Sequence, residues 1–104
     1  MAIKEINSDI FKEEVLDSKL PVLVDFNADW CGPCRMLKPI VDELSNERDD
    51  YKFVSINIDN NGDLAEEFGI LSIPCLVIIK EGKEVNRNVG LLQKQELEKF
   101  LGDK

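Results

Sequence analysis

Two of the chain's three cysteines, Cys31 and Cys34, are separated by only two residues. A pair at this spacing can close a small disulfide ring or supply two ligands to a metal ion. The apolar run 22–26 precedes the pair, and a helical pattern from Arg35 to about Glu47 follows it. The first sulfur therefore falls where a strand leads into a helix N-terminus. The exposed N–H groups and the helix dipole at that point stabilise a thiolate, so the pattern favours thiolate chemistry.

The spacing alone leaves two other interpretations open. A zinc half-site would need two more ligands, and only Cys75 and carboxylates could provide them because the chain contains no histidine. A purely structural disulfide would add little stability because the closed loop is very short. An odd cysteine count without an export signal also indicates a reducing compartment. The strand-to-helix context within a βαβ unit favours redox chemistry over both alternatives.

The bulk composition excludes several classes of partner. Thirteen basic and 21 acidic residues give a net charge of -8, which argues against nucleic acid and anionic membranes, since both bind basic patches. The first six residues do not resemble a signal peptide, and no apolar run approaches the length of a membrane span. The 104 residues are expected to form a single domain, 1–104, located in the cytoplasm.

Periodicity and turn residues predict the elements that position the cysteines. The continuously apolar stretch 22–27 is typical of a central strand covered on both faces. A helix should run from about Pro33 to Glu47 and kink at Pro39, whose missing N–H cannot bond to the carbonyl of Arg35. The other predicted elements are strand 2–6, a helix capped by Ser8, strand 52–58, a short helix ending at Phe68, strand 75–80, strand 84–89 and helix 94–101.

The order of these elements predicts an α/β fold. Strands and helices alternate early in the chain, and a hairpin turning at Glu81-Gly82 comes late, so a mixed sheet should lie between layers of helices. The buried side of the helix after the cysteines should carry Met36, Leu37, Ile40, Val41 and Leu44, and that of the last helix Leu97, Phe100 and Leu101.

The pentapeptide Trp30-Cys31-Gly32-Pro33-Cys34 resembles the active-site motif of the thioredoxin family. Other landmarks of that family follow in the right order along essentially the whole chain: Val24-Asp25-Phe26, Pro39, Asn57-Ile58-Asp59, Gly69-Ile70, Ile73-Pro74 and Val89-Gly90. The resemblance implies a thioredoxin fold, with a central mixed sheet of five strands flanked by four helices and a cis peptide bond at Ile73-Pro74. It also implies a dithiol/disulfide oxidoreductase that needs no bound cofactor or metal beyond its own redox-active disulfide.

The resemblance also implies a role for each residue of the motif. Cys31, nearer solvent, is the nucleophile that attacks a target disulfide, and the more buried Cys34 resolves the resulting mixed disulfide. Gly32 and Pro33 form the turn between them, and Pro33 suits a first helical turn, where its missing N–H is not needed. The stiffness of Pro33 favours the role of reductant. The implied partners are disulfide-containing target proteins and a thioredoxin reductase of unknown type, and the protein is expected to act as a monomer.

Asp25 is the other residue with an expected chemical role. A carboxylate in an apolar strand is costly unless it is paired or protonated. It either reaches water or a donor at the strand end or, as the resemblance implies, is a buried acid of raised pKa that accepts the proton of Cys34. Many relatives carry a Trp where this chain has Asn27 and a Lys where it has Ser55. Without that ammonium, Asp25 lacks one possible charge partner.

A docking face is implied around Trp30, Ile73, Pro74, Val89, Gly90 and Leu91. Trp30 should shield the site and contact substrate rather than fill the core. The backbone at Ile73 and Cys75 should pair with an extended segment of the target. Cys75 itself is either a small half-buried strand residue or a third thiol near the site, open to oxidation. Three roles stay open: a general reductant, a dedicated electron donor to one enzyme, and a binding subunit without enzymatic activity.

Overall fold

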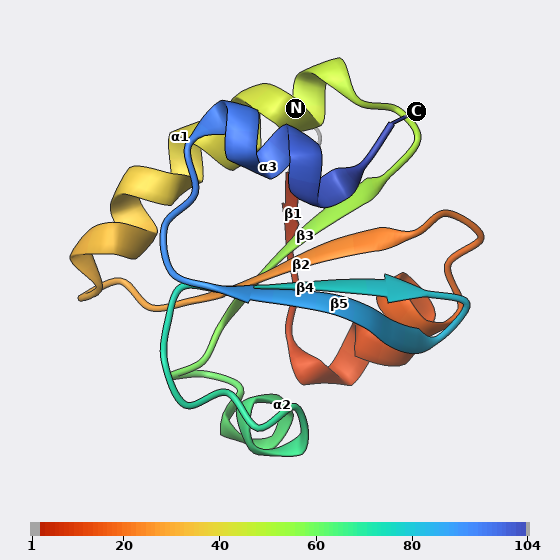
Figure 1. Cartoon of the computed structure of the whole chain (residues 1–104). Helices are drawn as coiled ribbons and strands as arrows, with labels where there is room; N and C mark the ends of the chain where they lie inside the picture. Colours follow the sequence, from red (N-terminus) through yellow and green to blue (C-terminus); the bar gives the residue numbers. More distant parts are fainter. Residues whose placement is uncertain (1–2, 104) are drawn as a thin grey trace.

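The computed structural model describes residues 3–103, and its five strands form one mixed sheet in the order β1-β3-β2-β4-β5 (Figure 1). The strands are β1 (Ile3–Glu5), β2 (Val22–Asn27), β3 (Lys52–Asn57), β4 (Cys75–Lys80) and β5 (Lys83–Val89). β1, β3 and β2 are parallel to one another, whereas β4 is antiparallel to both β2 and β5. The apolar strand β2 is therefore central, as its sequence predicts.

Helices cover both faces of this sheet. The α-helices are α1 (Gly32–Glu47), α2 (Gly62–Glu67) and α3 (Lys94–Leu101). The first helical segment is irregular, with a 3-10 turn η1 (Ser8–Ile10) followed by a π-helical stretch η2 (Lys12–Leu16). Figure 1 shows α1 and α3 on one side of the sheet and the N-terminal segment and α2 on the other. The α/β architecture with a mixed five-stranded sheet is confirmed.

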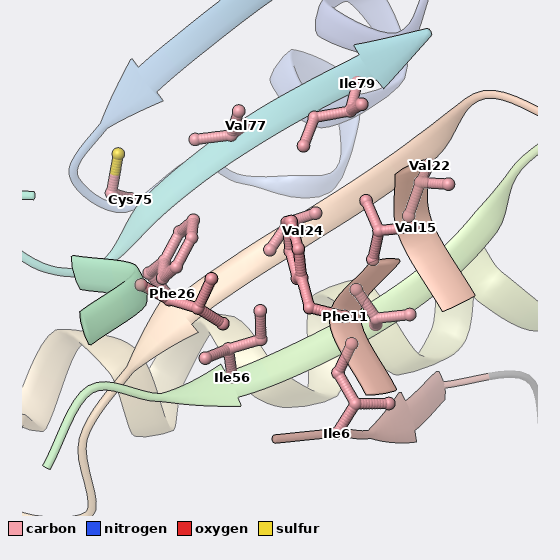
Figure 2. Close-up of a cluster of buried hydrophobic side chains, with 12 residues drawn as sticks. Ile6, Phe11, Val15, Val22, Val24, Phe26, Ile56, Cys75, Val77 and Ile79 are labelled. Atoms are coloured by element: carbon pink, nitrogen blue, oxygen red, sulfur yellow. The ribbon is translucent and has the colours of Figure 1, made fainter. Parts of the chain in front are cut away.

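The two faces of β2 build two separate cores. Val22, Val24 and Phe26 join the cluster drawn in Figure 2, where they meet side chains of β4 and of the N-terminal segment. Leu23 points to the opposite face and packs with Leu37 of α1 and with α3. Because side chains alternate along a strand, Asp25 lies on the same face as Leu23, under α1. The alternation thus separates the carboxyl group of Asp25 from the purely apolar cluster.

Three details of the predicted elements are wrong. Ser8 does not cap the first helix: Asn7 precedes the 3-10 turn, and the Ser8 N–H donates instead to Oδ1 of Asn61 at 2.8 Å. Met36 is 59% exposed, because the buried stripe of α1 runs through Cys34, Leu37, Val41 and Leu44 and leaves Met36 beside it. Strand β1 covers only Ile3–Glu5, and residue 2 of the predicted strand lies outside the described residues.

Several local predictions are confirmed. The Ile73-Pro74 peptide bond is cis. Glu81 and Gly82 both have positive φ, at 53° and 79°, the backbone conformation of a tight hairpin turn. Pro39 lies inside α1, as predicted.

The helices described within residues 3–103 include none with the length and apolarity that a membrane span requires.

Candidate active site

Cys31 lies at the junction between the central strand and α1. After β2 ends at Asn27, a short connection brings Cys31 to the N-cap position of α1, with extended backbone angles of φ -87° and ψ 112°. Its Sγ accepts a hydrogen bond from the Cys34 backbone N–H at 3.2 Å, and Pro33 occupies the first helical turn. Cys31 and Cys34 form a disulfide, with Cα atoms 5.2 Å apart. The sulfur of Cys31 thus takes the place of a capping side chain at the positive end of the helix.

The expected contrast in exposure between the two cysteines is not observed in this disulfide state. Cys31 is 4% exposed and Cys34 5%. Both pack with Ala28 in a small apolar cluster to which Ile58 and Ile73 contribute. The reason is that Sγ of Cys31 lies against the cis-proline loop, 3.9 Å from the carbonyl oxygen of Ile73. The two sulfurs therefore differ in their position at the helix end rather than in their burial.

The cis-proline loop connects the cystine to the far side of the sheet. Pro74 is buried and immediately precedes β4. Its carbonyl oxygen accepts a hydrogen bond from the Gly90 N–H at 2.8 Å, which ties the loop to the end of β5. Val89 is 57% exposed, and Ile73 is half-buried. The structure therefore brings together Ile73, Pro74, Val89 and Gly90, as the sequence predicts.

Trp30 lies on the surface, not in the core. Its side chain is 65% exposed, and its Nε1 donates a hydrogen bond to Oδ2 of Asp59 at 2.9 Å. The Asp59 backbone N–H is in turn bonded to Oδ1 of Asn57 at 2.8 Å, which fixes the turn after β3. Sequence reasoning missed Asp59 as a partner of Trp30. It also missed Leu71, which precedes the cis-proline loop and is 97% exposed.

A cavity of about 410 Å³ opens behind the disulfide, between α1 and the ends of β2 and β3. It is lined by Glu5, Asp25, Asn27, Ala28, Asp29, Cys34, Arg35, Lys38, Pro39, Ser55 and Asn57. Asp25 and Cys34 thus face one common space. Nδ2 of Asn27 donates to Oγ of Ser55 at 2.8 Å and to the Asp25 backbone oxygen at 3.0 Å. The two residues that depart from the family pattern therefore pair with each other.

The carboxyl group of Asp25 is buried and incompletely paired. Its residue is 6% exposed, and Oδ1 has no hydrogen-bond partner among the described residues. Burial raises the pKa of Asp25 from 3.8 to about 6, against the smaller lowering effects of the Asn27 amide and the charge of Lys38. The raised pKa and its cause, desolvation, are as predicted. Such a group changes its protonation state close to neutral pH.

Cys75 is more buried than its sequence context predicts. Its side chain is 1% exposed, and it belongs to the apolar cluster with Phe26 and Val77 (Figure 2). That cluster lies on the sheet face opposite Asp25. Desolvation raises the pKa of the Cys75 thiol, which keeps it in the unreactive neutral form. Cys75 is therefore a core residue rather than a half-buried one.

Together these features define the class of protein to which the site belongs. A cystine at the start of a helix that follows the central strand of a mixed sheet, beside a cis-proline loop, is the arrangement of a thiol–disulfide oxidoreductase. No group of three or more His, Cys, Asp or Glu residues within 3–103 could hold a metal ion, so the zinc interpretation has no support there.

Comparison with known proteins identifies the family. The family model described as Thioredoxin matches residues 2–103. A thioredoxin of Rickettsia felis is 51% identical over 88 residues, which cover 84% of each chain. A thioredoxin of Synechocystis is 49% identical over 96% of this chain and 98% of its own, and one of Pyropia yezoensis is 46% identical over 97% of this chain and 95% of its own. The chain belongs to the thioredoxin family.

Membership of this family gives the disulfide its chemical meaning. Thioredoxins are thiol–disulfide oxidoreductases, and the Cys31–Cys34 pair cycles between dithiol and disulfide. In the family, a thioredoxin reductase returns electrons to the pair, and disulfides in other proteins receive them.

Proposed function

We propose that the protein is a general protein-disulfide reductant in which Cys31 is the nucleophile and Cys34 the resolving thiol. The observation that carries this assignment is the position of Cys31 Sγ at the N-cap of α1, where it accepts the Cys34 N–H at 3.2 Å. A helix N-terminus stabilises a thiolate, and the thiolate is the attacking form. Gly32 and Pro33 hold the turn that keeps the two sulfurs in reach of each other.

The reaction has two exchanges. The Cys31 thiolate attacks one sulfur of a target disulfide, forms a mixed disulfide and displaces the other target sulfur as a thiolate. Cys34 then loses its proton to Asp25 across the shared cavity and attacks Cys31 Sγ. This step re-forms the Cys31–Cys34 disulfide and releases the second target thiolate, so that two electrons have passed to the target. A thioredoxin reductase restores the dithiol, and no separate cofactor is needed on this chain.

The docking face in this proposal surrounds the cis-proline loop. Trp30 and Val89 provide exposed apolar surface, and Ile73, which approaches Cys31 Sγ, is followed by Pro74, whose carbonyl oxygen bonds to Gly90. An extended target segment pairs with the backbone of Ile73. Cys75 is a weaker candidate for this pairing, because its backbone already faces a partner residue in β2 and another in β5.

The proposal extends to the setting of the protein. We place it in the cytoplasm, acting in electron transport as a monomeric single domain of residues 1–104. A reducing compartment suits a chain that keeps a free buried cysteine in addition to a redox-active pair.

A trapping experiment tests this function. Cys34→Ser removes the resolving thiol, so mixed disulfides between Cys31 and target proteins should accumulate in a cell lysate at least tenfold over the Cys31→Ser/Cys34→Ser control. Adducts with many proteins are expected for a general reductant. A single adduct would instead identify a dedicated electron donor, and a lane identical to the control would indicate a binding subunit.

A further inference from the structure

The cavity behind the disulfide contains a cationic residue that the thiol exchange does not use. Lys38 lies on α1, four residues beyond Cys34, so the two residues share one side of the helix. It lines the same cavity as Asp25 and Cys34. Its side chain is exposed and makes no hydrogen bond or ion pair with any residue in 3–103. The ammonium group is therefore free to act on whatever the cavity holds.

The opposite wall of the cavity is polar but uncharged. Asn27 and Ser55, which bond to each other at 2.8 Å, line the cavity on that side. Ser55 is also the register partner of Asp25 on β3. On its other side, Asp25 is paired with Leu76 of β4, an apolar residue. Neither neighbouring strand supplies Asp25 with a positive charge at these positions.

The acidic groups around the cavity and Arg35 do not supply Asp25 with a positive charge either. Glu5 of β1 and Asp29 after β2 are both acidic and bring no positive charge to the cavity. Arg35 of α1 is cationic, but its Nη1 is directed at the Asp29 backbone oxygen at 3.4 Å. Lys38 is thus the cation of the cavity without a partner among the described residues.

We propose that Lys38 is a positioning residue for the resolving step: across the cavity, its ammonium stabilises the Asp25 carboxylate as the acceptor of the Cys34 proton. The inference rests on the proposed role of Asp25. In this arrangement Lys38 of α1 supplies Asp25 with the positive charge that Ser55 of β3 does not supply. Burial favours the protonated acid, which cannot accept a proton, and a nearby cation favours the carboxylate. The charge of Lys38 acts on Asp25 in the expected direction.

Lys38→Gln tests the proposal, with Lys38→Arg as the conservative variant and Lys80→Gln as the matched control. Lys80 is an exposed lysine at the end of β4 that does not line the cavity, so its loss changes the net charge equally. Carbon-13 NMR of the oxidised protein follows the titration of the Asp25 carboxyl directly. The midpoint should rise by on the order of half a pH unit in Lys38→Gln and return in Lys38→Arg. A Lys38→Gln midpoint no higher than that of Lys80→Gln overturns the inference.

The pH profile of the resolving step separates this inference from the proposed function. Stopped-flow measurement of mixed-disulfide decay should give a profile displaced to higher pH in Lys38→Gln by the same amount as the NMR midpoint. If the carboxyl midpoint moves and the profile does not, Lys38 does control the charge of Asp25, but Asp25 is not the proton acceptor. In that case the proposed mechanism is wrong while the electrostatic coupling stands.

Discussion

At the scale of single residues, the burial of Asp25 has a thermodynamic consequence. Its pKa is about 6 in the folded protein against 3.8 in the unfolded chain, so the folded state binds the proton more tightly. Above about pH 6 the buried Asp25 carboxylate lowers the free energy of unfolding by its full amount. Below about pH 4 this loss of stability vanishes, because Asp25 is protonated in both the folded and the unfolded state. The protein retains a group that lowers its stability at neutral pH.

Replacing Asp25 with Ala should therefore stabilise the protein at pH 7. We expect the free energy of unfolding to rise by about 2 kcal/mol, less than the full linkage effect because some packing is lost with the side chain. Near pH 4 the gain should disappear. Urea unfolding of both proteins at the two pH values measures this, and stopped-flow kinetics should show slower resolution in the variant. Lower stability at pH 7 together with unchanged turnover would contradict both expectations.

Prediction from the sequence succeeds for residues whose role is set by a short stretch of neighbouring residues. The Cys31–Cys34 pair and the cis bond before Pro74 are carried by short motifs, and the raised pKa of Asp25 follows from its apolar strand. The partner of Trp30 could not be found in this way. Asp59 is 29 residues away along the chain, and only the alignment of β2 and β3 brings it within 2.9 Å of the indole nitrogen.

At the scale of elements, Asn61 joins three parts of the fold. It is 1% exposed, and its Oδ1 accepts from the Ser8 N–H at 2.8 Å. Its Nδ2 donates to the Asn57 backbone oxygen at 2.9 Å and to Oδ1 of Asn7 at 3.1 Å. Its own carbonyl oxygen accepts the Leu64 N–H at the start of α2. The side chain of Asn61 thus fastens the N-terminal helical segment to the end of β3, while its backbone carbonyl bonds to the first turn of α2.

Asn61→Ala should lower the free energy of unfolding by roughly 2–3 kcal/mol, because it leaves the Ser8 backbone N–H without its acceptor and removes the buried hydrogen bond to the Asn57 carbonyl oxygen. Asn60→Ala is the matched control, since Asn60 is the exposed neighbour in the same turn. Chemical denaturation of both variants measures the difference. Equal losses in the two variants would show that the buried amide makes no special contribution.

The same contact explains why the first helix differs from its predicted form. The sequence pattern of 8–16 indicates a helix capped by Ser8, and capping would normally use the Ser8 side chain. In the fold, the Asn61 side chain accepts a hydrogen bond from the Ser8 N–H, and the segment begins as a 3-10 turn and continues as a π-helix. Strands and longer helices were predictable because their periodicity is strong. The form of this segment depends on a residue 53 positions away in sequence.

At the scale of the whole molecule, the chain carries a net charge of -8, whereas the proposed docking face carries exposed apolar side chains. Asp29 and Asp59 are exposed beside Trp30, so the negative potential extends to the edge of that face. Long-range charge of this kind changes the rate of encounter more than the strength of the final complex. Targets with basic residues near their disulfide should be favoured.

Two model peptides with the same disulfide, one flanked by lysines and the other by glutamates, would test this effect. At low ionic strength the basic peptide should be reduced several-fold faster by the dithiol form. Adding salt to 0.15 M should slow its reduction and speed that of the acidic peptide. Second-order rate constants at the two salt concentrations provide the measurement. Rates independent of both peptide charge and salt would contradict electrostatic steering.

The burial of Cys75 affects which of the three cysteines can take part in thiol–disulfide exchange. Cys75 lies among the apolar side chains of Figure 2 and its thiol pKa is raised by burial, whereas Cys31 and Cys34 form the disulfide, so the redox-active thiols are those of the pair. Cys31 and Cys34 are oxidised and reduced together, in two-electron steps. In the folded state the Cys75 thiol is buried and does not exchange with them. A chain with an odd number of cysteines thus behaves chemically as one with an even number.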